Sequence, residues 1–173
     1  TPDAVELNKL LAEMVEKGCK YCFMEVSSHA IHQHRIAGLE FDLAIFTNIS
    51  HDHLDYHKTF DEYIKAKKAF FTHLSSDAIA LVNNDERHGQ TMVMDSKAKV
   101  YTYALKSMAD FKCRIVENTF AGMQLNMDGQ EVWSQLIGSF NAYNLLVVYA
   151  SAILLGEEKL QALTSISTLN SVE

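Results

Sequence analysis

Apolar residues along the first half of the chain alternate between helical spacing and short unbroken runs. The helical spacing is that of an amphipathic face, and the unbroken runs are typical of buried strands. An alternation of this kind is typical of a parallel sheet covered by helices. The pattern predicts helices over 1–17, just after Ser27, and over 60–74, with strands at 21–24, 43–47 and 78–82.

The pattern changes in the second half to short alternating segments, from about Val100 to Ile137. Asp128-Gly129 within them is a hairpin turn signal. We expect a small, mainly antiparallel sheet attached to the first one. An apolar helix then follows over 142–155, with Asn141 as a possible cap, just as Thr1 could cap the first helix. The fold class expected is therefore α/β, with a mainly parallel, Rossmann-like sheet.

Composition narrows the class of protein. The 173 residues are 48% hydrophobic with a single proline, which is typical of one compact domain. The net charge of -7, without a basic stripe, argues against nucleic acid and against an anionic membrane surface as partners. No apolar stretch approaches the ~20 residues that span a bilayer. We expect a cytoplasmic monomer. Because the chain opens with Thr1 at a helix start, we also expect a piece of a longer protein.

The three cysteines are odd in number and irregular in spacing, which favours a reducing compartment. Cys19 and Cys22 form a C-x-x-C pattern. Redox motifs of this form place the first cysteine at a helix N-terminus, whereas here a helix ends before Cys19 and Cys22 would lie in a strand. The pattern therefore does not predict a redox site.

Polar residues gather where the predicted strands end. Glu25 follows the first strand, Asn84-Asp85 follow the third, and residues 51–57 after the second hold three histidines and two aspartates. Because the carboxyl ends of parallel strands meet at one edge of a sheet, these groups are expected to converge there. Carboxylates are hard oxygen ligands of the kind that Mg²⁺ prefers. The arrangement predicts a metal or phosphate site.

Several segments together resemble the central, ATP-hydrolysing domain of the Mur ligases. They are Met24–His29, Phe46–His57, Tyr63–Lys67, Asn83–Asp85 and Gly138–Asn144. Within the family, the match is closest to the members that add the third residue of the peptidoglycan stem peptide. The resemblance covers most of the chain and implies that residues 1–173 are part of such a domain.

The resemblance implies a catalytic magnesium site. The family's E-V-S-S-H glutamate and D-H-L-D histidine, which serve magnesium and the phosphates, fall on Glu25 and His53. The family's carbamylated lysine falls on Lys67. Carbamylation by carbon dioxide turns a cation of pKa ~10.4 into an anionic oxygen ligand for Mg²⁺. Read without the family, Lys67 is a solvated cation on a helix.

The resemblance also implies contacts to both substrates. The residues that match the family's contacts to its nucleotide-sugar peptide are Thr1, Ser27, Gln33 and Arg35, and those that match residues near ATP are Asn141, Asn144 and Asp85. The planar fork of an arginine suits a carboxylate or a phosphate. If the resemblance to the family is set aside, each of these is interpreted as a routine capping or surface residue, and Asp85 as a residue that ends a strand.

The implied reaction transfers the γ-phosphoryl group of ATP, the co-substrate, to the terminal carboxylate of UDP-MurNAc-dipeptide. The amine of an amino acid, with meso-diaminopimelate preferred over L-lysine, then attacks the acyl phosphate. No G-x-x-G-K-[ST] loop occurs in this chain, although the family carries one just upstream of the matched region. The family's N-terminal UDP-binding domain and C-terminal domain are also missing, so we expect this fragment to fold but not to ligate.

Two alternatives from other classes stay open. His51-x-His53-x-Asp55 resembles the ligand motif of metallo-β-lactamase-like zinc hydrolases, although Tyr56 stands where the next histidine is expected and no clear downstream ligands are found. The other alternative is a noncatalytic binding module that keeps the sheet without the chemistry. Folylpolyglutamate synthetase shares the general plan, but Gln33-x-Arg35 favours the cell-wall ligases.

Overall fold

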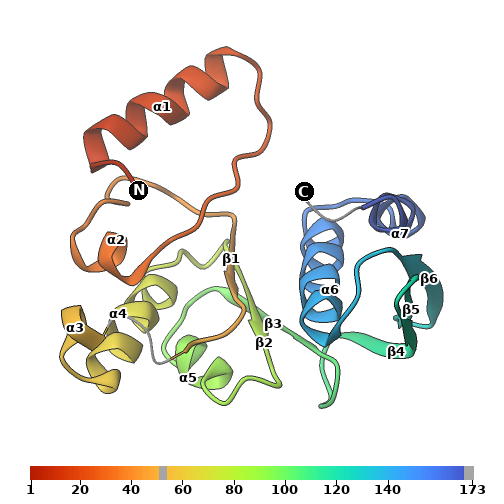
Figure 1. The fold of residues 1–173 in the computed structure, drawn as a ribbon. Coiled ribbons are helices and arrows are strands. Elements are labelled where there is room, and N and C mark those ends of the chain that lie inside the picture. Colours follow the sequence, from red (N-terminus) through yellow and green to blue (C-terminus); the bar gives the residue numbers. More distant parts are fainter. Residues whose placement is uncertain (51–53, 170–173) are drawn as a thin grey trace. The chain divides into compact units, whose positions relative to one another are not determined.

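The computed structural model of the chain describes residues 1–50 and 54–169, and it separates into two compact units. We call residues 1–42, 50–78 and 91–98 the helical unit, and residues 43–49, 79–90 and 99–173 the sheet unit. Figure 1 labels their helices and strands along the chain. Each unit is built from segments that are distant in sequence.

The helical unit contains α1 (Ala4–Glu16), α2 (Ser28–His32), α3 (Leu54–His57) and α4 (Phe60–Thr72). Helix α4 confirms the prediction over 60–74, and it begins at Thr59, whose hydroxyl accepts from the Glu62 N–H at 3.2 Å. Helix α1 begins one turn later than expected. Its cap is Asp3 rather than Thr1, and the Asp3 carboxylate accepts from the N–H groups of Val5 and Glu6, both at 2.9 Å.

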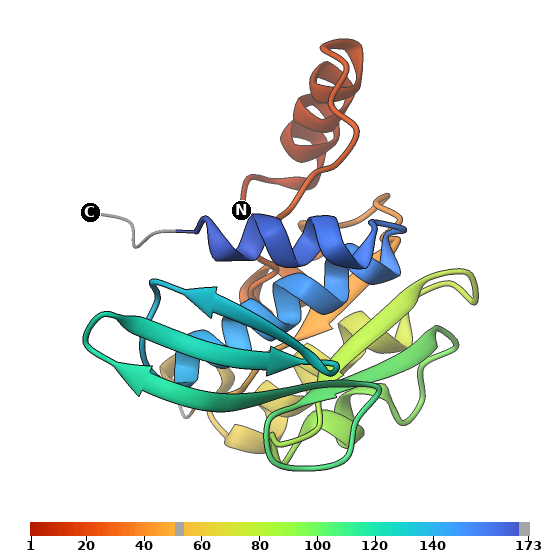
Figure 2. The same cartoon turned by 90° about the vertical axis from the view of Figure 1, so that its right-hand side faces the viewer.

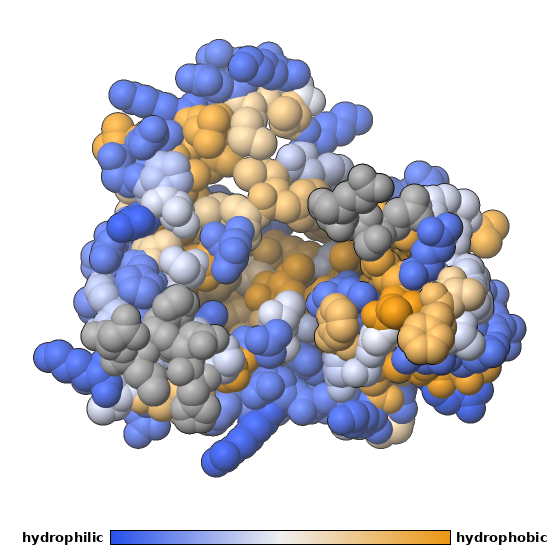
Figure 3. Space-filling model, in the orientation of Figure 1, coloured by the Kyte–Doolittle hydropathy of each residue, from blue (hydrophilic) through white to orange (hydrophobic). Residues whose placement is uncertain are grey.

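Helix α1 is amphipathic, but much of its apolar face is exposed. Leu7 is buried, whereas Val5 and Val15 are exposed to solvent. Figure 3 shows both hydrophobic and hydrophilic residues at the surface over this helix. The Asn8 amide ties α1 to the loop after α2 by donating to the Ala37 carbonyl at 3.1 Å.

The predicted strand at 21–24 was wrong. Residues 19–27 have no regular structure, and the side chains of Tyr21 and Phe23 are 60% and 77% exposed. A strand needs a neighbour to satisfy its backbone N–H and C=O groups. The described residues of the helical unit form no strand that could pair with it. Glu25 therefore does not lie at the end of a strand.

The sheet unit confirms the predicted α/β class with one mostly parallel sheet. Its strands are β1 (Leu43–Phe46), β2 (Ile79–Asn83), β3 (Lys99–Ala104), β4 (Phe111–Thr119), β5 (Gly122–Met127) and β6 (Gln130–Ser134), in that spatial order. β1 to β4 pair in parallel, and β4 to β6 pair antiparallel. β3 was expected in the antiparallel part but continues the parallel sheet. In β1, Ile45 is 38% exposed, so this strand is not buried on both faces.

Two helices cover one face of this sheet, α6 (Ser139–Leu154) and α7 (Lys159–Ser167), as Figure 2 shows for β4 to β6. α6 begins after Gly138 at φ +92°, so the expectation that Asn141 caps it was wrong. The core between these helices and the sheet includes Leu81, Tyr103, Met123, Leu125, Met127, Leu145, Leu146, Tyr149 and Ile166.

Three helices of the described residues were not predicted, namely α3, α7 and the short α5 (Gly89–Val93). No helix among the described residues is both long enough and apolar enough to cross a membrane.

Candidate functional site

Arg35 organises a hydrogen-bonded cluster in the helical unit. Its Nη1 donates to the main-chain carbonyl of Thr1 at 2.8 Å, and its Nε and Nη2 donate to Gln33 Oε1 at 2.9 and 2.6 Å. The structure thus brings together three of the four predicted substrate residues. The fourth, Ser27, caps α2 by accepting from the Ala30 N–H at 3.1 Å.

The charge of Arg35 is not neutralised within this cluster. Its acceptors, the Thr1 carbonyl and the Gln33 amide, are both neutral. Among the described residues, no carboxylate lies within ion-pair distance of its guanidinium group. A fixed, partly buried guanidinium with no counter-ion among the described residues is suited to bind a carboxylate or a phosphate.

Tyr56 belongs to the same cluster, although the sequence did not single it out. Its hydroxyl accepts from Gln33 Nε2 at 3.1 Å and lies 2.9 Å from His32 Nδ1, and its ring centroid is 3.9 Å from that of His29. Next to it, the buried His57 and Ser28 form a hydrogen bond of 2.9 Å between Nε2 and Oγ. Tyr56 and His57 lie within the segment Phe46–His57, and Ser28 and His29 within Met24–His29, and that position was the one signal the sequence offered for these four residues.

Lys67 and Glu25 interact electrostatically in the helical unit. Burial lowers the pKa of Lys67, and the nearby carboxylate of Glu25 opposes this by raising it. The Lys67 ammonium also lies 5.4 Å from the ring centroid of Tyr63. Lys67 is therefore not the solvated cation of the simpler interpretation.

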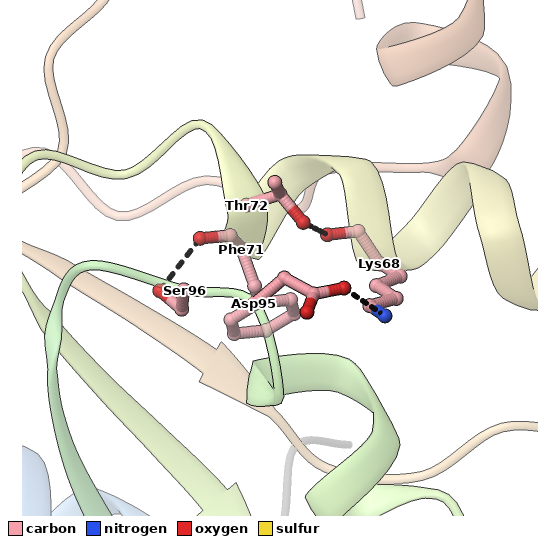
Figure 4. A network of polar contacts seen from close by, with 5 residues as sticks. All are labelled: Lys68, Phe71, Thr72, Asp95 and Ser96. Atoms are coloured by element: carbon pink, nitrogen blue, oxygen red, sulfur yellow. Dashed lines mark hydrogen bonds and ion pairs between the residues drawn. The ribbon is translucent and has the colours of Figure 1, made fainter.

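The neighbouring Lys68 has a different role, which Figure 4 shows. Its Nζ forms an ion pair of 2.5 Å with Asp95, and the Ser96 hydroxyl donates to the Phe71 carbonyl at 2.7 Å. These contacts tie residues 95–96 to α4. Lys68 is thus a structural lysine next to a candidate functional one.

The predicted metal site is described only in part. His53 lies outside the described residues, so two of its three predicted members, Glu25 and Lys67, can be placed. Among the residues that the structure describes, no group of three or more His, Cys, Asp or Glu side chains could hold a metal ion.

Asp85 joins three elements of the sheet unit. It follows β2, and its carboxylate accepts from the N–H groups of Leu105, Lys106 and Ser107 at 2.7 to 2.8 Å. The hydroxyl of Tyr143, on α6, donates to it at 2.8 Å. Partial burial by itself would raise the pKa of Asp85, but these hydrogen bonds outweigh burial and hold the pKa well below its usual range.

The two asparagines before Asp85 support the same region. Asn83 Nδ2 donates to the Thr47 carbonyl at 3.0 Å, which ties the end of β2 to the residue after β1. Asn84 Nδ2 donates to the Met108 carbonyl at 2.8 Å, and its Oδ1 accepts from Gln90 Nε2 at 2.9 Å.

Asn141 and Asn144 share one face of the first turns of α6. Asn141 Nδ2 donates to the Ile137 carbonyl at 2.8 Å, and Asn144 Nδ2 donates to Asn141 Oδ1 at 3.4 Å. Tyr143, which lies between them in sequence, bonds to Asp85. The three predicted nucleotide residues therefore belong to one connected region of the sheet unit, whereas Glu25 and Lys67 belong to the helical unit.

Comparison with known proteins identifies the family. Residues 1–152 match the model of the Mur ligase middle domain. The chain belongs to the Mur ligase family. This match does not favour the zinc-hydrolase alternative, whose motif residues His51 and His53 lie outside the described residues.

Individual Mur ligases are similar over nearly the whole chain. It is 57% identical to the UDP-N-acetylmuramoyl-L-alanyl-D-glutamate--2,6-diaminopimelate ligase of Cytophaga hutchinsonii, over 99% of this chain and 35% of the relative. It is 54% identical to the enzyme of the same name from Phocaeicola vulgatus, over 99% of this chain and 36% of the relative. The chain thus spans about a third of the length of these curated relatives.

Solved structures agree with the fold. A structure of a ligase of the same name superimposes with a TM-score of 0.90 at 28% identity, over 100% of this chain and 37% of that chain. The structure of MurF from Acinetobacter baumannii has a TM-score of 0.67 at 16% identity, over 76% of this chain and 30% of that one, which shows a shared fold alone.

Proposed function

We propose that this chain is part of an ATP-dependent ligase that adds meso-diaminopimelate to UDP-MurNAc-L-Ala-D-Glu in peptidoglycan synthesis. The observation that carries the proposal is the 57% identity to a diaminopimelate ligase over 99% of the chain. The helical unit adds a physical argument, because its Arg35 cluster presents a positive charge that lacks a described counter-ion. The substrate ends in a carboxylate and carries phosphates, which are the groups that an arginine binds in pairs of hydrogen bonds.

The chemistry has two steps. A carboxylate oxygen of the dipeptide attacks the γ-phosphorus of ATP, and ADP leaves. The amine of the incoming amino acid then attacks the acyl carbon, phosphate leaves with the C–O bond electrons, and the amine loses a proton. We assign Arg35, Gln33, Thr1 and Ser27 to holding the dipeptide substrate. A fixed guanidinium orients the attacking carboxylate at low entropic cost.

We assign Glu25, His53 and a carbamylated Lys67 to a magnesium site. Carbamylation requires a neutral amine, and the lowered pKa of Lys67 makes that form more accessible. A carbamate beside the Glu25 carboxylate would place two anions together, an arrangement that a divalent cation stabilises. When bound, magnesium would supply compensation for the negative charge that develops on the phosphates.

We assign Asn141, Asn144 and Asp85 to the nucleotide side of the site. The two asparagine side chains lie on the first turns of α6, where they carry amide groups that can pair with a base or a ribose. We further propose that the ligase acts in the cytoplasm as a monomer. The isolated 173-residue chain, without a phosphate loop of its own, is proposed to be inactive.

The test is phosphate release by the full-length protein that contains this chain. It is supplied with ATP, magnesium and UDP-MurNAc-dipeptide, and with meso-diaminopimelate, L-lysine or no amino acid. Release should require the dipeptide and should be fastest with meso-diaminopimelate. Lys67→Ala should reduce kcat by about a hundredfold, as expected when a group that stabilises transition-state charge is lost.

Lys68→Ala is the matched control, because it removes the adjacent lysine of α4, whose partner is Asp95. It should lower stability slightly and leave kcat within about twofold, as for the loss of a partly buried ion pair at the surface. Equal loss of activity in the two variants would contradict the assignment of Lys67. No phosphate release with any amino acid, from a folded full-length protein, would contradict the proposed function.

A further inference from the structure

The carboxylate of Asp85 has little capacity left for a ligand. Oδ2 already accepts from the Leu105 and Lys106 N–H groups and from the Tyr143 hydroxyl, and Oδ1 accepts from the Ser107 N–H. A carboxylate offers about four lone-pair sites, two on each oxygen, so the three bonds to Oδ2 fill that oxygen and Oδ1 keeps about one site. Asp85 is also an anion, and direct contact with the phosphates of ATP would be repulsive without a cation between them.

The partners of Asp85 lie on two other parts of the sheet unit. Three of its bonds hold the main chain at residues 105–107, between β3 and β4. The fourth holds Tyr143, which lies on α6 between Asn141 and Asn144. The orientation of these two asparagines about the helix axis therefore depends on where Tyr143 is fixed.

We propose that Asp85 is a positioning residue, which sets the first turns of α6 for nucleotide binding through the Tyr143 hydroxyl rather than by touching ATP. This inference rests on the proposed function, and it reassigns how one residue of that site acts. The bond to a charged acceptor is of the strong class, so a single hydroxyl can hold the helix end in register. The binding groups that this contact would position are the neutral amides of Asn141 and Asn144.

The chain offers a matched control on the same helix. Tyr149 lies near another aspartate, Asp128, and burial together with that carboxylate raises the pKa of Tyr149 to about 12. It lies further along α6, five positions after Asn144. Tyr143→Phe and Tyr149→Phe therefore both remove a tyrosine hydroxyl near an aspartate, one beside the asparagines of the proposed nucleotide site and one further along α6.

The experiment measures the Kd of a fluorescent ATP analogue and the KM values of the full-length ligase. Tyr143→Phe should raise the Kd and the KM for ATP about tenfold, the effect expected of losing one hydrogen bond to a charged group, and should leave the KM for the dipeptide unchanged. Tyr149→Phe should lower the Tm to a similar degree without changing the KM for ATP. If the Tyr143 hydroxyl had a purely structural role, the two variants would show the same changes in Tm and in the KM for ATP.

A double-variant cycle separates positioning from contact. If Asp85 acts through Tyr143, then Asp85→Asn combined with Tyr143→Phe should bind ATP no more weakly than Asp85→Asn alone. Additive losses would mean that Asp85 contacts the nucleotide directly, and equal KM values for ATP in the two tyrosine variants would mean that Tyr143 has no positioning role. Either result overturns the inference while the ligase activity stands. A wild-type protein that binds no ATP would overturn the proposed function together with it.

Discussion

Replacing Gly89 with alanine tests how closely α5 approaches the end of β2. An ideal Cβ on Gly89 would lie 2.3 Å from the Asn83 carbonyl oxygen and 3.3 Å from its carbonyl carbon. Both atoms are backbone, so no side-chain rotation can relieve the contact. The same oxygen accepts from the Glu86 N–H at 3.3 Å, and the Glu86 carbonyl accepts from the Gly89 N–H at 2.9 Å. The turn must therefore shift as a whole.

The magnitude follows from three contributions. Overpacking against a fixed neighbour costs ~1–3 kcal/mol. Loss of one hydrogen bond in the turn costs a further ~0.5–1.5 kcal/mol. Alanine regains up to ~1 kcal/mol over glycine at a helical position. Together these contributions predict that Gly89→Ala lowers the free energy of unfolding by about 0.5–4.5 kcal/mol.

Urea unfolding of the 173-residue chain measures this change, and Gly129 supplies the comparison. Gly129 has φ +85° and no atom within 4 Å of an ideal Cβ, so its substitution tests backbone conformation alone. Asparagine tolerates that conformation better than alanine. Gly129→Asn should therefore be more stable than Gly129→Ala, whereas Gly89→Asn should be no more stable than Gly89→Ala. A Gly89→Ala chain within about 0.5 kcal/mol of the wild type, the range of neutral surface changes, would refute the reasoning.

The reactivity of the three thiols and the loss of stability at low pH give two more tests. A thiol reagent should modify the exposed Cys19 and Cys22 quickly in the folded chain. Cys113 should react slowly, because it is buried and burial raises its pKa to about 12. Fast modification of a third thiol would contradict that burial. The pKa of Asp85 in the folded chain lies below its unfolded value of ~3.9. Its contribution to the free energy of unfolding is therefore present above the unfolded pKa and is lost as pH falls through the folded pKa. Urea unfolding from about pH 5 down to pH 2 should show a smaller loss of stability for Asp85→Asn than for the wild type, and parallel curves would disagree.

Local patterns determined a large part of the fold. The spacing of apolar residues predicted α4, and the Asp128-Gly129 turn predicted the hairpin that joins β5 and β6. These elements depend on residues close in sequence, namely a capping hydroxyl at Thr59 and a turn that accepts positive φ at both positions. The motifs likewise indicated the Mur ligases, because each motif is a run of neighbouring residues that can be recognised without its folded surroundings.

Tertiary structure decided the features that need a distant partner. The apolar run at 21–24 has the composition of a strand, but a strand forms only where another chain segment offers hydrogen bonds, and these residues stay irregular. The partners of Asp85 lie 20 to 58 positions along the chain, so its role as a junction could not be read from its neighbours. The sequence determined which residue types are present and which family they belong to. Long-range hydrogen bonds decided which of those residues are held together, because such bonds depend on the folded path of the whole chain.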